Sequence, residues 1–356
     1  MSFFSFSKKN NKKEKYSLAF TITSGSATGA IIKFTKEPGV QVIYSKKETI
    51  PNPSELKKSL SLLVSDLQKK KVVIDKAFYL FSSPWSISQT KTILVKENKA
   101  FKVTPAYLEK IIDQHTQKDF SEIGKIIEKK IVQMKMNGYI VEQATGQLTR
   151  DLEVSIFITA VPEKVLSDVE DAVAKAFIVK NIWCHSLSLP IFSMIRDFFP
   201  HKDDFININI SDEMTDLSLV RDGLIVSEAS FPLGRNYFIK ELAKSMKVTE
   251  GIADSMIKVN AVKVNDELAA LKLSVAISKS AEDWAHQISS VLSQWKEKQY
   301  VPDTVFLLAS PDLSSFVSAK LKGQDLKFFL IDRKQIKSDD VIFKIGLMFL
   351  DKMYKI

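Results

Sequence analysis

Two segments of the chain place a short polar turn between stretches of alternating apolar residues, which is the pattern of a β-hairpin. The first segment spans residues 16–34, with a Ser/Gly turn at residues 24–26. The second begins at Phe205, turns at residues 211–215 and returns through Asp222-Gly223, a dipeptide that favours a tight hairpin turn. Each segment opens one half of the chain, so the pattern predicts a duplicated α/β architecture. A small polar turn between strands can also wrap backbone N–H groups around a phosphate.

Periodicity along the rest of the chain predicts further helices and strands. Apolar residues spaced three and four positions apart predict helices at residues 53–70, 162–177, 235–260 and 281–298. A last helix is expected after Asp339 and Asp340, because negative charge is favourable at a helix N-terminus. Apolar runs predict strands at residues 40–44, 77–82 and 305–309.

Residues 85–160 differ in character and predict a small inserted α+β domain. A strand at residues 90–95 is followed by Thr104-Pro105, an N-cap and first-turn proline that begin a helix. A second helix is expected from about Phe120 to Met136, with Gly138 ending it. Its predicted apolar face consists of Ile123, Ile126, Ile127, Ile131 and Met134. Strands at residues 139–141 and 152–160 complete the insertion.

The composition is that of a globular protein with room for two or more domains. Of 356 residues, 45% are hydrophobic and 26% charged. No apolar run approaches the roughly 20 residues that span a bilayer, and the N-terminus lacks the apolar region of a secretory signal. The single cysteine, Cys184, follows Trp183 in an apolar segment and is expected to be a buried thiol. These features predict a cytoplasmic protein.

Catalytic and metal-binding motifs are not recognisable in the sequence. The four histidines lack the spacing of metal ligands, and Gly25 and Gly29 do not form a phosphate-binding loop of the P-loop type. No catalytic residue and no metal ligand are therefore expected.

The net charge is +9, and its distribution points to an anionic partner. Residues 1–15 combine three phenylalanines with five lysines and predict a basic, flexible tail. Such a tail can dock on an anionic membrane surface, where each basic residue contributes about 1 kcal/mol; a polar tail without a partner is the alternative. Lys125, Lys129 and Lys135 would give the insertion a basic face for an acidic partner. No nucleic-acid-binding motif accompanies the charge, so nucleic acid is not an expected partner.

Residues 205–234 resemble the second phosphate-binding hairpin of the actin-like ATPase superfamily. The resemblance rests on Glu213, on Thr215-Asp216, on the Arg221-Asp222-Gly223 turn and on the Pro232-Leu233-Gly234 exit. An ordinary β-meander is the alternative for the hairpin taken alone. Within the superfamily the chain is most similar to the branch of the cell-division protein FtsA and the pilus-assembly protein PilM. Residues 127–139 and 152–162 are similar to the SHS2 segment of FtsA.

The resemblance implies an α/β, actin-like (ribonuclease H-like) fold of duplicated domains that face each other across a nucleotide cleft, with an inserted α+β SHS2 domain. The implied divisions are the tail at residues 1–15, domain I at 16–84, the SHS2-like insertion at 85–160, the return of domain I at 161–204 and domain II at 205–356.

Several positions depart from the family pattern in ways that weaken a nucleotide site. In the first hairpin Thr21 replaces the Asp that orients Mg²⁺ and water, Thr23 a Gly, and Thr28 the Lys. In the second, Asn209 replaces an Asp and Ser211 a Gly. The glycine-rich adenosine loop becomes residues 309–311, Ala-Ser-Pro. Loss of carboxylates removes hard ligands for Mg²⁺, and loss of glycines adds atoms where a ligand would approach.

These departures predict a pseudo-ATPase whose cofactor is either absent or weakly bound Mg·ATP. The residues of the vestigial nucleotide site would be Ser24, Gly25, Ser26, Asn209, Asp212, Glu213, Thr215 and Gly234.

Three functions are open. The first is an FtsA-like scaffold of the bacterial cytoskeleton in cell division, peripheral to the inner face of the cell membrane, which the SHS2-like segment favours. The second is a PilM-like protein of type IV pilus assembly, which the length and the Phe/Lys-rich start favour. The third is an active, ATP-binding actin-like ATPase. The expected partners are proteins of the division or pilus machinery, a second copy of the chain through the insertion, and the anionic membrane surface.

Overall fold

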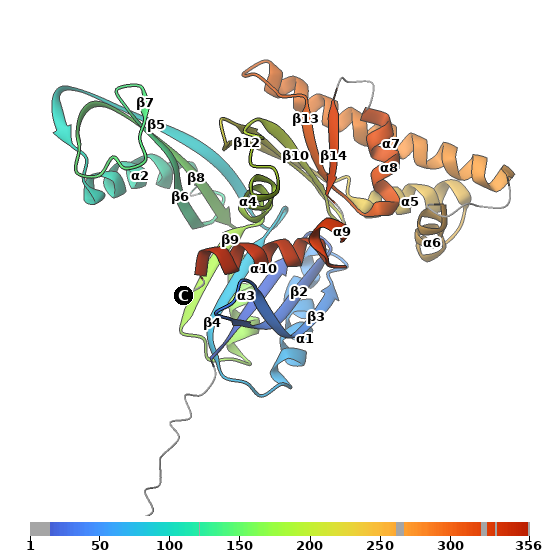
Figure 1. Ribbon diagram of the computed structural model, residues 1–356. Coiled ribbons are helices and arrows are strands. Elements are labelled where there is room, and N and C mark those ends of the chain that lie inside the picture. Colours follow the sequence, from blue (N-terminus) through green and yellow to red (C-terminus); the bar gives the residue numbers. More distant parts are fainter. Residues whose placement is uncertain (1–14, 121, 261–266, 322–325, 332, 355–356) are drawn as a thin grey trace, which may run out of the picture.

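The computed structural model describes residues 15–120, 122–260, 267–321, 326–331 and 333–354. The basic tail predicted for residues 1–15 therefore lies outside the described residues, apart from Lys15. Three β-sheets organise the chain, and Figure 1 shows each of them flanked by helices.

The first sheet has the strand order β3-β2-β1-β4-β9 and is mixed, because β2 and β3 run antiparallel to their neighbours. Helices α1 and α3 pack on one face and α4 and α10 on the other, so the central strands β1, β2 and β4 are largely buried, whereas β3 is largely exposed. The strands are β1 (Tyr16–Ile22), β2 (Ser26–Phe34), β3 (Val40–Thr49), β4 (Ile74–Phe81) and β9 (Asn181–Ser186). The helices are α1 (Leu56–Gln68), which follows the 3₁₀ turn η1 (Pro53–Glu55), α3 (Glu163–Ala174), α4 (Ser188–Phe198) and α10 (Val341–Tyr354).

The second sheet repeats this topology in the order β12-β11-β10-β13-β14. The duplication predicted from the two hairpin segments is thus present, and each copy begins with strand, polar turn, strand. The strands are β10 (Phe205–Ile210), β11 (Thr215–Arg221), β12 (Leu224–Phe231), β13 (Thr304–Leu308) and β14 (Lys327–Ile331). The helices of this half are α5 (Arg235–Met246), α6 (Glu250–Asn260), α7 (Glu267–Lys296), α8 (Pro311–Leu321) and α9 (Arg333–Ile336).

The last helix, α10, returns to the first half of the molecule. Asp340 Oδ1 accepts a hydrogen bond from Phe343 N–H at 3.0 Å, which caps the helix as the two acidic residues predict. The helix then lies across the first sheet, in contact with β1, β3 and α4 (Figure 1). The division at residues 205–356 groups α10 with the second half, and the proposed domain boundaries stay a prediction.

The third sheet lies in the insertion and is antiparallel, in the order β5-β8-β6-β7. Thr104 begins its helix as predicted, because its Oγ1 accepts the N–H of Tyr107 at 3.1 Å. The elements are β5 (Ile87–Lys102), α2 (Pro105–Phe120), β6 (Lys125–Met136), β7 (Tyr139–Ile140) and β8 (Leu148–Val161).

The prediction of a helix from Phe120 to Met136 is wrong, because residues 125–136 form strand β6 and Phe120 is the last residue of α2. It pairs with β8 along its length, and the register shifts between Ile126 and Glu128 and again between Ile131 and Gln133. Each bulge adds one residue and resets the alternation of a strand. Two resets leave isoleucines at spacings of three and four, which imitate the period of a helix.

The basic face predicted for the insertion is therefore on a strand. Lys129 Nζ lies 2.6 Å from Asp113 Oδ1, and Lys135 Nζ lies 2.9 Å from Glu153 Oε1. Both charges are balanced within the insertion. Among the described residues, no helix is long and apolar enough to cross a membrane.

Candidate functional site

The polar turns that open the two halves are in direct contact. The first turn joins β1 to β2 and the second joins β10 to β11. Ser24 Oγ lies 2.9 Å from Ser211 Oγ, and Ser26 Oγ donates a hydrogen bond to Asp212 Oδ2 at 3.1 Å. The backbone N–H of Glu213 donates to Ser24 Oγ at 2.9 Å. Three hydrogen bonds thus join the first turn directly to the second.

The donors and acceptors of this contact form a consistent set. Ser211 Oγ donates to the carbonyl of Met214 at 2.9 Å, so the Ser24 hydroxyl is the donor between the two serines. Ser24 then accepts from Glu213 and donates to Ser211. The hydroxyl groups of Ser24, Ser26 and Ser211 therefore all take part in hydrogen bonds within or between the turns. A phosphate could bind them only if these bonds were broken.

Two glycines allow the second turn to be packed closely, one by the first turn and the other by helix α5. A Cβ atom on Gly25 would lie 2.4 Å from Cβ of Asp212, which is far inside van der Waals contact. A Cβ atom on Gly234 would lie 2.5 Å from the backbone of Glu213 and Met214. The first glycine is required because the turns touch, and the second because helix α5 packs tightly under the second turn.

The N-terminus of α5 is also occupied by the second turn. Arg235 N–H donates to the carbonyl of Ser211 at 2.9 Å, and Asn236 N–H donates to the carbonyl of Asp212 at 2.8 Å. Free N–H groups at a helix N-terminus are a ready anion site. Here the N–H groups of Arg235 and Asn236 donate to carbonyl oxygens of the second turn.

Two of the predicted site residues serve other purposes. Glu213 Oε1 accepts from Asn236 Nδ2 at 2.7 Å, and its other oxygen lies 3.4 Å from Lys240 Nζ, so the carboxylate faces α5. Thr215 is fully buried; its hydroxyl donates to the carbonyl of Leu233 and accepts from Trp284 Nε1 at 2.9 Å. Both side chains therefore connect the second turn to the helices packed against it, α5 and α7.

A cavity of about 170 Å³ lies beside the contact, between the two halves. Its lining includes Thr21, Asn209, Asp212, Pro311 and Asp340, so the positions that depart from the family pattern gather here. The volume is below the roughly 300 Å³ at which pockets for drug-sized ligands begin. The Thr21 hydroxyl in its wall is buried and has no hydrogen-bond partner among the described residues, which suits water.

The charges around this cavity oppose a polyphosphate. Asp212 and Asp340 present carboxylates, and Thr28 Oγ1 donates to Asp340 Oδ2 at 2.8 Å across the space between β2 and α10. The cations are already paired: Lys47 Nζ lies 3.6 Å from Asp340, and Arg235 lies 2.6 Å from Asp254 and 2.7 Å from Asp312. A triphosphate would meet negative charge without a free cation to offset it.

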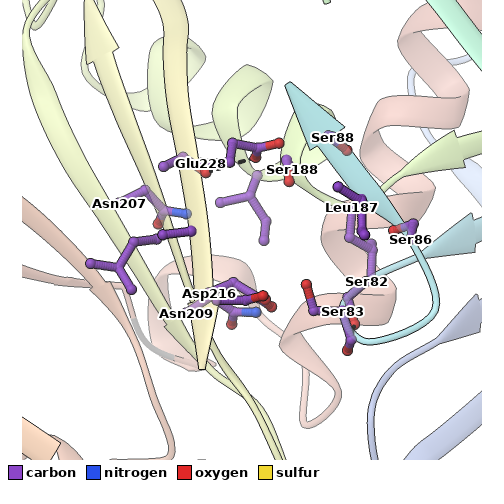
Figure 2. A pocket seen from close by; sticks show the side chains of 16 residues that line it. Ser82, Ser83, Ser86, Ser88, Leu187, Ser188, Asn207, Asn209, Asp216 and Glu228 are labelled. Atoms are coloured by element: carbon purple, nitrogen blue, oxygen red, sulfur yellow. Dashed lines mark hydrogen bonds between the residues drawn. The ribbon is translucent and has the colours of Figure 1, made fainter. Parts of the chain in front are cut away.

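A second, smaller pocket was not singled out by sequence reasoning. It measures about 90 Å³ and lies between strands β10–β12 and the segments that follow β4 and precede α4 (Figure 2). Serines and the side chains of Asn207, Asn209, Asp216 and Glu228 line it. Burial raises the pKa of the Asp216 carboxyl to about 7, against hydrogen bonding to Ser83 and Asn209, and burial also raises the pKa of Glu228.

Other reactive groups in the described residues do not form a site. Burial raises the pKa of the Cys184 thiol to about 12, so the thiolate that a nucleophile needs is scarce at neutral pH. No cluster of three or more His, Cys, Asp or Glu side chains in the described part of the chain could hold a metal ion.

Comparison with known proteins identifies the fold. No protein-family model and no curated protein matches the chain. The chain is similar to a solved PilM–PilN type IV pilus biogenesis complex, with a TM-score of 0.65 and 13% identity over 94% of this chain and 98% of that one. It is also similar to MreB5 of Spiroplasma citri bound to ADP, with a TM-score of 0.50 and 9% identity over 96% and 97%.

These likenesses show the fold alone. The chain has the actin-like ATPase fold, and the predicted α/β class with duplicated domains is confirmed. The placement in the FtsA branch, the SHS2 identity of the insertion and nucleotide binding by the eight site residues stay predictions.

We expect Gly25→Ala to lower the free energy of unfolding by about 1–3 kcal/mol, because the added methyl group must push the two turns apart. Gly251→Ala is the matched control. Its Cβ atom meets nothing within 4 Å, and the change should stay within about 1 kcal/mol. Urea titrations of both variants measure the difference. Equal stability of Gly25→Ala and the parent protein would mean that the turns do not touch in solution.

Proposed function

We propose that this chain is a non-catalytic scaffold of the PilM kind, which binds a protein partner of type IV pilus assembly at the inner face of the cell membrane. The observation that carries the proposal is the direct hydrogen bonding between the turns of Ser24 and Ser211. In an ATPase of this fold the phosphates would need the donors that these turns now exchange with each other.

The chemistry of phosphoryl transfer supports the same conclusion. Transfer depends on positioning and on neutralising charge with Mg²⁺ and cationic side chains. Thr21, Thr28 and Asn209 supply neither a carboxylate for the metal nor a cation for the phosphate. An active ATPase is therefore the least supported of the three functions.

A channel where the insertion meets the two halves offers a surface for a protein partner. One hollow of about 190 Å³ has an apolar floor that includes Phe157, Phe192 and Phe349. It adjoins a second hollow of about 520 Å³, and the two share Lys130 and Met353. We call this continuous surface the partner channel. Its apolar floor and basic rim suit an extended segment with an apolar anchor and acidic flanks.

The strand edges along the partner channel add main-chain groups. Strand β7 covers the outer edge of β6 only at Lys135 and Met136. In the described residues, β6 before these positions has β8 as its one strand neighbour, and β9 is the outermost strand of the first sheet. Open edges present N–H and C=O groups to which an extended partner segment can add as a strand.

A role in cell division is the second candidate. The similarity of residues 127–139 and 152–162 to the SHS2 segment of FtsA favours it. The pilus role is supported by the similarity to a PilM–PilN complex over nearly the whole of both chains. The identity of the bound partner separates the two roles.

Nucleotide should leave the stability of the protein unchanged. A ligand at a hundred times its dissociation constant would stabilise the fold by roughly 2.7 kcal/mol. We expect thermal melts in Mg·ATP and in the same concentration of Mg²⁺ without nucleotide to coincide, since the turns occupy one another. A higher melting temperature with Mg·ATP would contradict the proposal and favour an ATP-binding protein.

Lys130→Glu should weaken partner binding at least about tenfold, because it reverses a charge on the rim of the partner channel. Lys110→Glu, on the exposed side of α2, is the matched control and should bind normally. Co-purification from the source cells, with identification of captured proteins by mass spectrometry, compares the two. Recovery of the same partners by Lys130→Glu would place the interface elsewhere. Capture of division proteins instead of pilus proteins would favour the FtsA-like role.

Residues 1–15 should bind anionic lipid, because three phenylalanines precede five lysines. Full-length protein is expected to pellet with vesicles of anionic lipid at low salt and to be released at high salt, since the attraction is screened. Protein lacking these residues should stay in the supernatant. Equal pelleting of both proteins would reject the tail as an anchor.

A further inference from the structure

The serine-rich pocket of about 90 Å³ brings together oxygen atoms from both halves of the molecule. Ser83, Ser88 and Ser188 come from the first half and its insertion, at the end of β4, in β5 and at the start of α4. Asn207, Asp216 and Glu228 come from three adjacent strands of the second sheet. Figure 2 shows Asp216 and Asn209 side by side opposite Ser83, with Glu228 beside Ser188.

Two acceptors in this pocket have no partner. Asn207 is 4% exposed, and its Oδ1 atom is buried without a hydrogen bond. Asp216 Oδ1 is likewise buried and has no hydrogen bond among the described residues, although Ser83 and Asn209 form hydrogen bonds with the carboxyl group. A buried acceptor without a donor lowers the stability of the fold unless another group approaches it. The unsatisfied atoms are both acceptors, so the missing group is a donor or a cation.

The carboxyl groups of Asp216 and Glu228 favour a cation over a neutral donor. Ser218 pairs with Glu228 and Asp216 pairs with Ser230 across β11 and β12, so Asp216 and Glu228 are diagonal neighbours on one face of the sheet. Ser218 Oγ donates to Glu228 Oε1 at 3.1 Å, and Ser188 and Ser88 also form hydrogen bonds with this carboxyl group. Among the residues that the structure describes, no lysine or arginine lines the pocket to balance them. Two neighbouring buried carboxylates without a counter-charge repel each other.

We propose that this pocket binds a hard divalent cation, Mg²⁺ or Ca²⁺, independently of nucleotide. Asp216 and Glu228 supply the two negative charges, Asn207 Oδ1 supplies a neutral amide oxygen, and serine hydroxyls and water complete the shell. Carboxylate, amide and hydroxyl oxygens are the ligands that these ions take. The pocket has room for an ion with several water molecules.

A bound cation would tie the two halves together at a second place. The carboxylates lie on strands of the second sheet, whereas Ser83, Ser88 and Ser188 belong to the other side of the pocket. The turn contact of Ser24 and Ser211 joins the halves at the polar turns. The ion would therefore act on the stability of the assembled halves, which thermal unfolding reports.

The test uses the full chain, freed of metal with a chelator and without nucleotide. Thermal melts in MgCl₂, CaCl₂ and, at matched ionic strength, KCl are compared, with calorimetric titration for stoichiometry. We expect a saturable rise in melting temperature with at least one of the divalent ions, no comparable rise with KCl, and one ion per chain. No rise with either divalent ion, or an equal rise with KCl, overturns the proposal.

Variants locate the ion. Asp216→Asn and Glu228→Gln keep the side-chain shape and should each weaken binding at least about tenfold. Asn207→Ser retains both carboxyl groups, should also weaken binding, and serves if a carboxyl variant fails to fold. Asp303→Asn removes a half-exposed carboxylate outside the pocket and should bind as the parent protein does. Unchanged affinity in the foldable pocket variants would assign the ion to another site and overturn the proposal.

Discussion

The contact between the two polar turns is the constraint on which the rest of the structure depends. It places Ser24 and Ser26 against Ser211 and Asp212, at hydrogen-bond distance. This approach is sterically possible because Gly25 has no side chain to meet Asp212. Once the turns touch, the hydroxyl groups of Ser24 and Ser26 and the N–H group of Glu213 form hydrogen bonds between them. The cavity that remains beside them is correspondingly small.

The turn contact does not act alone, because the last helix makes further polar contacts with the first sheet and the insertion. Thr28 of β2 donates to Asp340 at the start of α10, and α10 then packs along the first sheet. At the end of this helix, Tyr354 OH lies 2.7 Å from His185 Nε2, whose Nδ1 lies 2.7 Å from Glu128 Oε1 of β6. The insertion, the first sheet and the last helix are thus joined through buried polar groups. A protein held at so many points is suited to presenting a fixed surface, which favours a scaffold over an enzyme that must open and close.

The sequence predicted the architecture well, because the duplication leaves a local trace in each hairpin. Thr104, Asp340 and the Asp222-Gly223 turn act as their residue types indicate. Strand β6 was predicted as a helix because two bulges, which depend on pairing with β8, altered its apolar spacing. The roles of Glu213 and Thr215 could not be predicted either, since both depend on distant partners in α5 and α7. Nor does any local pattern reveal that Gly25 faces Asp212, 187 positions further along the chain.

The departures from the nucleotide-binding pattern make physical sense as adaptations to this contact. A carboxylate at position 21 or 209 would face the acidic residues across the cleft without a metal ion between them, and like charges in a poorly hydrated gap repel strongly. Thr21 and Asn209 keep the oxygen atoms and remove the charge. The acids that remain near the contact have neutral donors or cations nearby: Ser26 donates to Asp212, and Thr28 and Lys47 approach Asp340. Neutral polar side chains at positions 21 and 209 are therefore compatible with direct contact between the two polar turns.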